Sequence, residues 1–420
     1  MSQLSATLLS KIKAINSKFP DAVVDLDKDR KDIEFLSSSG SLGLDEALGG
    51  SIVKGRIMEI YGPESCGKST LCQTIAGEVQ NKEGVVLYVD YEHAFHGPYA
   101  EVLGLDLSKL ILVQPNNLEE GGQIMEDLLE TGELSLIIID SVSAMSPIAE
   151  VEAEVAGATV GLIARKMGVI LRKITPLCAK KGTTAIFINQ LRTNIGAMGW
   201  GDDTVTSGGN ALKFFASVRI EMKKIGFESQ TEGGIKKKTA QKVLCKVIKN
   251  KTFRPWEEAS FMIEFGVGIV KESELVPLAI KFGLLKKCTK NKVAGIYLEY
   301  DTQLWDNTIP IEKNENDLMG VLREEEFVFI VKELNLRVKE KMGGMKMEEV
   351  MKEVEPLYFQ FKEITENHAK LMEEAAKLTN SSKWDEAYPL VEEALSLKPW
   401  DKPTQQRFKV ISEKAKRVEG

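Results

Sequence analysis

The sequence predicts an α/β protein built around a mostly parallel, twisted sheet, and two observations support this fold class. Between Ser37 and Gly268, short runs of apolar and β-branched residues alternate with segments of helical periodicity, the order of elements that produces a parallel sheet. The runs are almost continuously apolar, which is typical of strands buried on both faces. The four clearest predicted strands are residues 57–61, 85–89, 136–139 and 185–188.

The chain divides into four predicted parts. Residues 1–36 combine a helical pattern of leucine and isoleucine with a charged linker, and residues 37–268 form the α/β core. Residues 269–335 are predicted to form a small α+β domain, and residues 336–420 an added helical extension. A lysine cluster in and beside the small domain consists of Lys281, Lys286, Lys287, Lys290 and Lys292.

Within the extension, helices are predicted over residues 347–378 and 384–397, with a turn at 379–382 between them. Pro399 and Pro403 are expected to break the chain that follows. The second helix resembles half of a tetratricopeptide unit, but a lone repeat cannot bury its own face. A helical hairpin docked on its neighbour is therefore the expectation.

Composition narrows the class of protein. Hydrophobic residues make up 43% of the 420 residues and charged residues 28%, as in soluble globular proteins. No leader pattern and no long apolar run is present, so we expect no membrane association. The five cysteines are scattered, which favours a reducing cytoplasm. With a net charge of −7, any nucleic-acid contact must come from local basic patches.

A phosphate-binding loop is predicted after the first strand and before a helix over residues 70–80. Glycines at both ends of such a loop let backbone N–H groups converge on phosphates, and the helix that follows adds the dipole of its N-terminus. We expect Lys68 to reach the terminal phosphates and the Ser69 hydroxyl to bind Mg²⁺. The matching residues are Gly62, Pro63, Glu64, Ser65, Cys66, Gly67, Lys68 and Ser69, followed by Thr70.

Two carboxylates at strand ends are candidates for the chemistry beside this loop. Asp140 closes the apolar strand 136–139 and could order Mg²⁺ through water, although many core strands end in an aspartate that caps a helix. Glu92 follows the strand 85–89 and is the candidate to orient an attacking water, with Asp90 as the alternative.

Two stretches do not fit the alternation of strands and helices. Residues 150–159 are small and acidic, and residues 193–209 are rich in glycine and polar residues. Long loops inside a compact domain are usually functional or disordered. We therefore expect both to be mobile functional loops.

Several phrases of the sequence resemble the bacterial RecA family of DNA recombinases. They are residues 60–65 of the phosphate loop, 92–94, 187–190, 208–214 and 249–251, and the similarity runs from Ser37 to Gly268 and more weakly to about residue 305. The resemblance implies a RecA-type ATPase core. It also implies an ATP-dependent DNA strand-exchange recombinase of the cytoplasm that forms helical filaments on single-stranded DNA, pairs it with homologous duplex, and serves recombination and repair.

The resemblance implies roles around ATP. Glu92 would activate water, Gln190 would sense the γ-phosphate, and Tyr99 would stack on adenine. Lys249 and Lys251 would reach the nucleotide of the neighbouring subunit, as an arginine finger does elsewhere. ATP would then lie between subunits, and a head-to-tail contact that does not close gives an open helix. The N-terminal helix and linker would serve this subunit contact.

The resemblance also implies that the two loops hold single-stranded DNA, with arginines and glycine-rich backbone on phosphates and apolar wedges between bases. Trp200 is either a base-stacking platform or a hydrophobic anchor of its loop. The lysines at 286–292 would capture duplex DNA, unless they are only a solvated face. The implied DNA-binding residues are Val160, Arg165, Arg172, Arg192, Ile195, Trp200, Gly208, Gly209 and Asn210.

The chain departs from the family pattern in places. His96 stands where an acidic residue commonly contacts the adenine amino group, which puts base selectivity in question, and Asn194 stands where a lysine is usual. A helical extension replaces the short acidic tail that the family often carries, and its residues 402–417 include six basic residues and one acidic one.

Three alternatives share parts of these motifs. A ring helicase or translocase would use the same phosphate loop, but it would not be expected to carry the paired loops or the phrase at 208–214, and rings usually use an arginine finger. The second alternative is a filament-forming DNA-coating protein in which ATP only switches the affinity for DNA. The third is a signalling or clock ATPase that needs no DNA. DNA-stimulated turnover together with filaments would separate the recombinase from all three.

Overall fold

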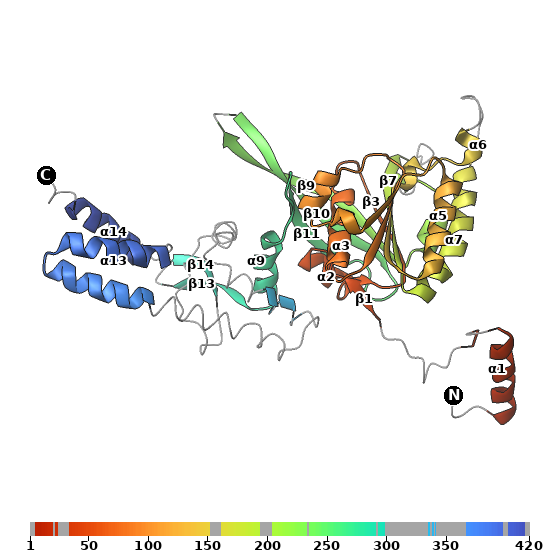
Figure 1. Cartoon of the computed structure of the whole chain (residues 1–420), viewed down its shortest axis with the longest axis horizontal. Coiled ribbons are helices and arrows are strands. Elements are labelled where there is room, and N and C mark those ends of the chain that lie inside the picture. The colour runs from red at the N-terminus through yellow and green to blue at the C-terminus, as the bar shows by residue number, and fades with distance from the viewer. Residues whose placement is uncertain are drawn as a thin grey trace.

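The computed structural model describes residues 5–19, 22–23, 33–151, 161–193, 204–232, 235–290, 293–298, 335–336, 338–339, 341, 367–397 and 402–415. An α/β core forms the largest part, and helices of the C-terminal extension lie at the other end of the molecule from the paired helices α5 and α7 (Figure 1). None of the helices in these residues combines the length and apolar composition needed to cross a bilayer.

A ten-stranded sheet forms the centre of the core, in the order β12-β11-β10-β9-β3-β7-β6-β4-β5, with β8 paired to β7. Its middle strands run parallel: β3 pairs with β7 and β9, and β6 pairs with β7 and β4. The strands are β3 (Ile57–Gly62), β4 (Val85–Asp90), β5 (Leu110–Val113), β6 (Leu134–Asp140), β7 (Thr184–Thr193), β8 (Thr204–Thr206), β9 (Val218–Glu232), β10 (Ile235–Asn250), β11 (Glu258–Glu264) and β12 (Gly268–Val270).

The four predicted strands are confirmed as β3, β4, β6 and β7, and so is the mostly parallel sheet. The sequence prediction missed the antiparallel group β9 to β12 at one side. These strands bury alternate residues, as Val243, Cys245 and Val247 do on β10. Such alternation is typical of antiparallel strands with one buried face.

Helices cover both faces of the sheet. Alternate side chains of β6 enter two separate cores, Leu136 and Ile138 on the side of α3, and Ile137 and Ile139 on the side of α5 and α7. This explains the continuous apolar runs, since both faces of the strand are buried. The helices of the core are α2 (Leu42–Leu48), α3 (Lys68–Gln80), α4 (Gly97–Val102), α5 (Leu118–Thr131), α6 (Ile148–Val151), α7 (Leu162–Lys181) and α8 (Ala211–Phe215), with 3-10 turns η1 (Leu107–Lys109) and η2 (Val142–Ala144).

The two expected loops are only partly described. Residues 152–160 and 194–203 lie outside the described residues. The flanks of the second loop are regular rather than irregular, because β8 pairs antiparallel with the end of β7 from Leu191 to Thr193. The expectation of a loop over 193–209 is therefore corrected at its two ends.

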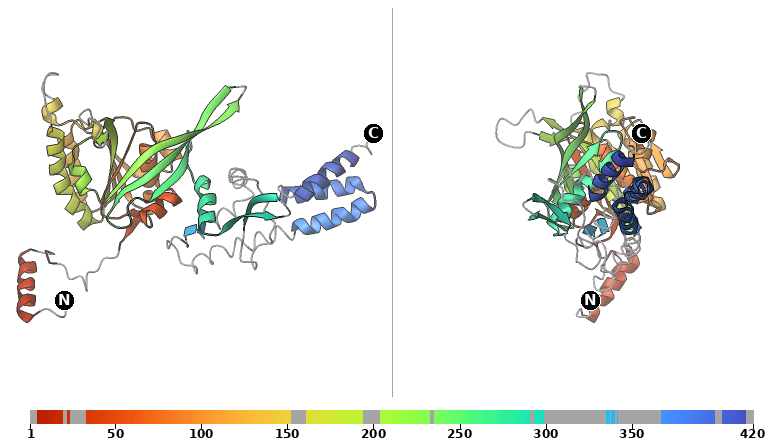
Figure 2. Two further views of the ribbon diagram at one scale, coloured as in Figure 1. Left: turned by 180° about the vertical axis from the view of Figure 1, so that it is seen from behind. Right: turned by 90° about the vertical axis from the view of Figure 1, so that its left-hand side faces the viewer.

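The long hairpin of β9 and β10 projects from the core as a two-stranded ribbon (Figures 1 and 2). Val218, Ile220 and Met222 of β9 are buried. From Lys223 to Lys238, none of the residues whose burial the structure describes is buried. Lys224 and Lys238 instead lie against the ring of Phe227, 5.0 Å and 3.9 Å from its centroid.

The remaining parts flank the core. Helix α1 (Ala6–Lys18) has no buried residue and stands apart from the core in both views of Figure 2. Strands β1 (Phe35–Ser37) and β2 (Ile52–Val53) pair with each other. Beyond the core come α9 (Glu272–Lys281) and the hairpin of β13 (Leu285–Lys290) and β14 (Val293–Leu298).

In the extension, residues 367–380 are helical, and α13 (Trp384–Leu397) and α14 (Lys402–Ala415) pack with them around Ala375, Val391 and Ile411. Helix α13 has the predicted bounds. Pro403, expected to break the chain, lies instead in the first turn of α14, where its missing N–H would have had no helical partner. The predicted division into four domains stays a prediction.

Candidate nucleotide and DNA sites

The predicted phosphate loop connects β3 to α3 at the carboxyl edge of the sheet. Gly67 caps α3 with a φ of 91°, and Lys68 is the first residue of the helix. A Cβ at Gly62 would lie 2.1 Å from the carbonyl oxygen of Met222, and one at Gly67 would lie 2.3 Å from Cδ1 of Ile263. Both positions therefore require glycine. The backbone of the loop and the N-terminus of α3 together have the arrangement of an anion-binding site.

Lys68 is folded over this loop. Its Nζ donates to the carbonyl oxygens of Gly62 and Pro63, at 3.1 Å and 2.7 Å. The side chain is buried and borders a cavity of about 600 Å³. The neighbouring Cys66 is also buried, and burial raises the pKa of its thiol.

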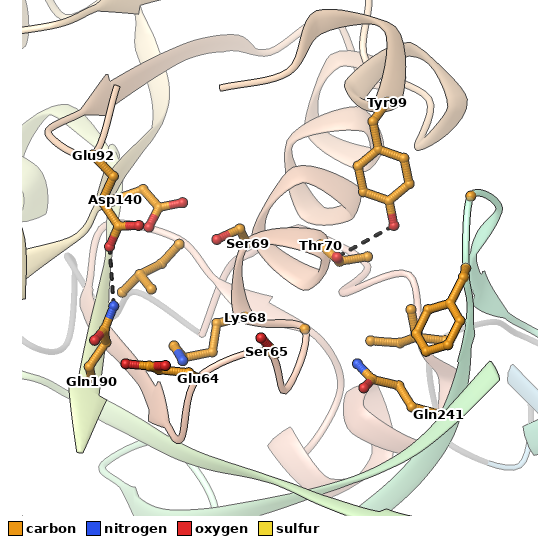
Figure 3. A pocket seen from close by; sticks show the side chains of 15 residues that line it. Glu64, Ser65, Lys68, Ser69, Thr70, Glu92, Tyr99, Asp140, Gln190 and Gln241 are labelled. Atoms are coloured by element: carbon orange, nitrogen blue, oxygen red, sulfur yellow. Dashed lines mark hydrogen bonds between the residues drawn. The ribbon is translucent and has the colours of Figure 1, made fainter. Parts of the chain in front are cut away.

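The cavity collects most of the predicted nucleotide residues at one place (Figure 3). They come from the phosphate loop, from the ends of β4, β6 and β7, and from α4, which are distant in sequence. The predicted residues that line it are Glu64, Ser65, Gly67, Lys68, Ser69, Thr70, Glu92, Tyr99, Asp140 and Gln190.

Asp140, at the end of β6, lies beside Ser69 in the first turn of α3. Burial raises the pKa of Asp140, and hydrogen bonds from the hydroxyls of Tyr88 and Ser69 oppose that rise. A carboxylate and a hydroxyl oxygen are hard donors of the kind that Mg²⁺ prefers. The glycine-lined cradle, the lysine and these two oxygens together fit a nucleotide with its magnesium ion.

Glu92 lies beside Asp140 and is connected to β7. Its Oε1 accepts hydrogen bonds from the Ser141 hydroxyl and from Nε2 of Gln190, the latter at 3.3 Å. Asp90, the alternative, accepts from the Phe95 N–H and from Gln114 at 3.0 Å each, and it does not line the cavity. The geometry favours Glu92 over Asp90 as the group that faces a bound nucleotide.

The other end of the cavity is lined by Tyr99 of α4. Tyr99 stands over α3, its hydroxyl 3.5 Å from Oγ1 of Thr70, and His96 caps its helix by accepting the Tyr99 N–H at 3.3 Å. Opposite Tyr99 the wall contains residues that the sequence analysis missed, because β10 and β11 carry no motif of their own. These are Gln241, Ile263, Phe265 and Gly266.

Lys249 and Lys251 do not line this cavity. They lie at the end of β10, where Lys249 Nζ donates to the carbonyl oxygens of Lys213 and Phe214 of α8, at 2.7 Å and 3.2 Å. Burial, followed by the charge of Lys251, lowers the pKa of Lys249. If either lysine contacts a nucleotide, that nucleotide would therefore have to be bound to another protomer.

The structure describes some of the predicted DNA residues and not others. Arg165 and Arg172 are exposed on α7, seven positions apart and thus on one face of the helix. Arg192 lies on β7, with its side chain outside the described part. The residues Val160, Ile195 and Trp200 lie outside the described residues altogether.

The segment of Gly208, Gly209 and Asn210 packs against the first turn of α7. A Cβ at Gly208 would be 2.7 Å from Val142, and one at Gly209 would be 2.6 Å from Ala164 of α7. Both glycines also have a positive φ, of 82° and 75°. No larger residue would let this segment lie against the helix that carries the two arginines.

A hydrogen bond from the buried Asn189 joins the end of β7 to this glycine segment. Asn189 precedes Gln190 on β7, and its Nδ2 donates to the carbonyl oxygen of Ser207 at 3.0 Å and to Glu59 at 2.9 Å. Glu59 in turn pairs with Arg219 at 2.5 Å. A shift of the end of β7 would thus be transmitted to the backbone beside Gly208.

Comparison with known proteins identifies a family for most of the chain. The family described as the RecA N-terminal domain matches residues 6–270. Protein RecA of a Nitratiruptor species is 47% identical over 279 residues, which cover 66% of this chain and 80% of the relative. Protein RecA of Helicobacter pylori is 41% identical over 343 residues, 81% of this chain and 93% of the relative. Protein RecA of Helicobacter hepaticus is 41% identical over 319 residues, 76% and 87% respectively.

Proposed function

The chain belongs to the RecA family of DNA recombinases, and from this premise we propose how its residues bind ATP and single-stranded DNA. As a member of that family it is a DNA-dependent ATPase that binds nucleotide and DNA, assembles into filaments, and acts in homologous recombination and repair. The predicted family and activity are thereby confirmed. We further propose a cytoplasmic protein whose filament is an open helix on single-stranded DNA that pairs with homologous duplex.

ATP would occupy the cavity between the phosphate loop and Tyr99. The backbone from Gly62 to Gly67 would cradle the phosphates, and Lys68 would exchange its loop carbonyls for the terminal phosphate oxygens. Ser69 and, through water, Asp140 would hold Mg²⁺, which when bound neutralises charge on the β- and γ-phosphates. Tyr99 would stack on one face of adenine, with Ile263 and Phe265 on the other.

Glu92 would orient the attacking water and accept its proton. Its carboxylate is held from one side by Ser141 and from the other by Gln190. Because Gln190 also borders the phosphate end of the cavity, it would register the γ-phosphate and alter this hydrogen bond. The adjacent Asn189 would carry the change to Ser207 and the glycine segment.

Assembly would use surfaces that one protomer leaves exposed. Helix α1 exposes Leu8 and Ile15 on one face, and the edge strand β5 exposes Ile111 and Leu112. We propose that α1 of one protomer docks on the core of the next. The same contact would bring Lys249 and Lys251 to the neighbour's nucleotide.

Single-stranded DNA would lie along α7 and the glycine segment. Arg165 and Arg172 would pair with phosphates, and the N–H groups of Gly208 to Asn210 would do the same. Arg192, Val160, Ile195 and Trp200 would complete the site from the two loops. Since phosphates are alike in every sequence, binding would be sequence-tolerant, and homology would be tested by base pairing.

The observation that supports this proposal best is the path from Glu92 through Gln190 and Asn189 to Ser207, because it would couple the proposed hydrolytic site to the proposed DNA site through one strand end. Its test is ATP hydrolysis with and without single-stranded DNA, beside electron microscopy of the same mixtures. We expect stimulated turnover and open helical filaments. Closed rings, or turnover indifferent to DNA, would contradict the proposal.

A further inference from the structure

A buried tyrosine contacts the carboxylate that we assign to magnesium. Tyr88 lies on β4 and is 1% exposed, and its hydroxyl donates to Oδ2 of Asp140 at 2.7 Å. The two residues come from neighbouring parallel strands, with Tyr88 opposite Ile138 and Asp140 at the end of β6. The hydroxyl therefore reaches the carboxylate from the core side, away from the cavity.

The ring of Tyr88 is held firmly in place. It belongs to the core that packs against α3, and its centroid lies 5.0 Å from that of Phe95 in an edge-to-face arrangement. Because Tyr88 is enclosed in a close-packed core, its ring cannot move without displacing buried neighbours. The position of the hydroxyl, and of the carboxylate oxygen that it binds, is consequently fixed by the core.

A carboxylate that acts through water has no direct metal bond to set its orientation. Hydrogen bonds from residues behind a ligand commonly provide that orientation, and their loss weakens metal binding. With Oδ2 occupied by Tyr88, Asp140 can rotate little. Its carboxylate is then presented to the cavity next to Ser69 (Figure 3).

We propose that Tyr88 is a positioning residue whose hydroxyl holds Asp140 in the orientation that orders Mg²⁺ beside Ser69. The proposal rests on the function proposed above, since it assumes that Asp140 serves the metal. It assigns no contact between Tyr88 and the nucleotide.

The same strand end provides a matched control. Tyr91 is also buried, and within the described residues its hydroxyl has no hydrogen-bond partner. It lies against Gly121 of α5, on the opposite face of the sheet from Tyr88. Tyr88 lies on β4 and Tyr91 directly after it, and replacement by phenylalanine removes one hydroxyl from each. Only the Tyr88 hydroxyl binds Asp140.

The test compares the full-length chain with Tyr88→Phe and Tyr91→Phe in their binding of a fluorescent ADP. Each protein is titrated with Mg²⁺, and binding is also measured in excess EDTA. For Tyr88→Phe we expect unchanged affinity in EDTA, with the Mg²⁺ concentration for half-maximal response raised by about tenfold, the lower end of losses seen for such supporting residues. Tyr91→Phe should match the unaltered protein.

Two results would overturn the proposal. One is a normal response of Tyr88→Phe to Mg²⁺. The other is a loss of ADP affinity in EDTA that is as large as the loss in the Mg²⁺ response, which would indicate a general disturbance of the nucleotide site. Asp140→Asn separates this proposal from the one on which it rests. If Asp140→Asn abolishes the Mg²⁺ response and Tyr88→Phe leaves it normal, only the role of Tyr88 fails; if Asp140→Asn has no effect, both fail.

Discussion

At the residue scale, Lys68 is the cation that we propose binds the terminal phosphates. We expect Lys68→Ala to lower DNA-stimulated ATP hydrolysis by about 10²-fold or more, since loss of one donor aimed at developing charge commonly costs that much. Nucleotide-dependent assembly and strand exchange should be lost with it. Phosphate release and a strand-exchange assay measure both.

The control for that variant is Lys82→Ala, which removes an exposed lysine that follows the far end of α3 and donates to the Leu36 carbonyl oxygen. It should behave as the unaltered protein. Undiminished strand exchange by Lys68→Ala would contradict the assignment of the nucleotide site.

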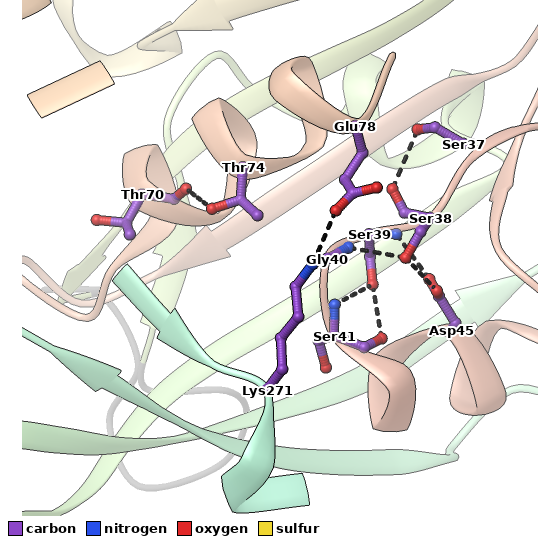
Figure 4. A network of polar contacts seen from close by, with 10 residues as sticks. All are labelled: Ser37, Ser38, Ser39, Gly40, Ser41, Asp45, Thr70, Thr74, Glu78 and Lys271. Atoms are coloured by element: carbon purple, nitrogen blue, oxygen red, sulfur yellow. Dashed lines mark hydrogen bonds and ion pairs between the residues drawn. The ribbon is translucent and has the colours of Figure 1, made fainter. Parts of the chain in front are cut away.

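Glu274 makes folding sensitive to pH. Burial raises its pKa from an ordinary 4.5 to about 8, although Ser41 and the Gly43 N–H donate to Oε2 at 2.5 Å and 2.8 Å. Folding thus favours the protonated acid. The stability that this group contributes is present below pH 4.5 and is lost as pH rises toward 8. The neighbouring Asp45, held by Ser38 and Ser39 (Figure 4), has its pKa raised to about 6 by burial.

Glu274→Gln should remove most of this dependence, because glutamine keeps an oxygen for Ser41 and Gly43 but cannot ionise. Relative to the unaltered protein, the variant should gain about 3–5 kcal/mol in free energy of unfolding between about pH 5 and about pH 9. Urea unfolding at both pH values measures this. Parallel pH profiles for the two proteins would contradict the assignment of the ionisation.

At the element scale, α7 presents two arginines on one face toward the glycine segment. Nη1 of Arg172 would lie 3.6 Å from a Cβ at Gly168, which places the guanidinium along the helix surface near α8. We expect Arg172→Ala to weaken binding to all single-stranded sequences alike and to lower the salt slope by about one. Fluorescence anisotropy at several salt concentrations measures both quantities.

The matched control on the same helix is Lys180→Ala, an exposed cation in its last turn. That change should leave the affinity for DNA and its salt slope as they were. A sequence-selective loss in Arg172→Ala would rule out a role confined to phosphates.

The elements that the sequence predicted well are those with a strong local signal. β3, β4, β6 and β7 are buried on both faces, so their apolar runs are continuous, and the phosphate loop has a fixed spacing. β9 to β12 were missed because an alternating pattern that contains many lysines is a weaker local signal than a continuous apolar run. The wall of the base site, with Ile263 and Phe265, was missed because it depends on β11 folding back to the sheet, which no local pattern reveals.

At the scale of the whole molecule, α1 carries the clearest test of assembly. We expect Ile15→Asp to prevent ATP-dependent filament formation while the protomer still binds nucleotide, because the side chain is 42% exposed and contributes to no core. Light scattering and electron microscopy follow assembly, and fluorescent ADP follows binding.

Ser10→Asp places the same charge on the opposite side of α1 and should permit assembly. Filaments of normal length with Ile15→Asp would show that this face of α1 is not the contact.

The ribbon of β9 and β10 has a consequence for how the chain moves. Its inner half is sealed by Val218, Ile220 and Met222, whereas the outer half has no buried side chain among the residues whose burial is described, and two of its lysines lie over Phe227. Backbone amides of this outer half should therefore exchange with deuterated solvent far sooner than amides of the same two strands inside the core. Within one pair of strands, the free energy of local opening would then rise from near zero at the outer end to near the free energy of global unfolding at the inner end.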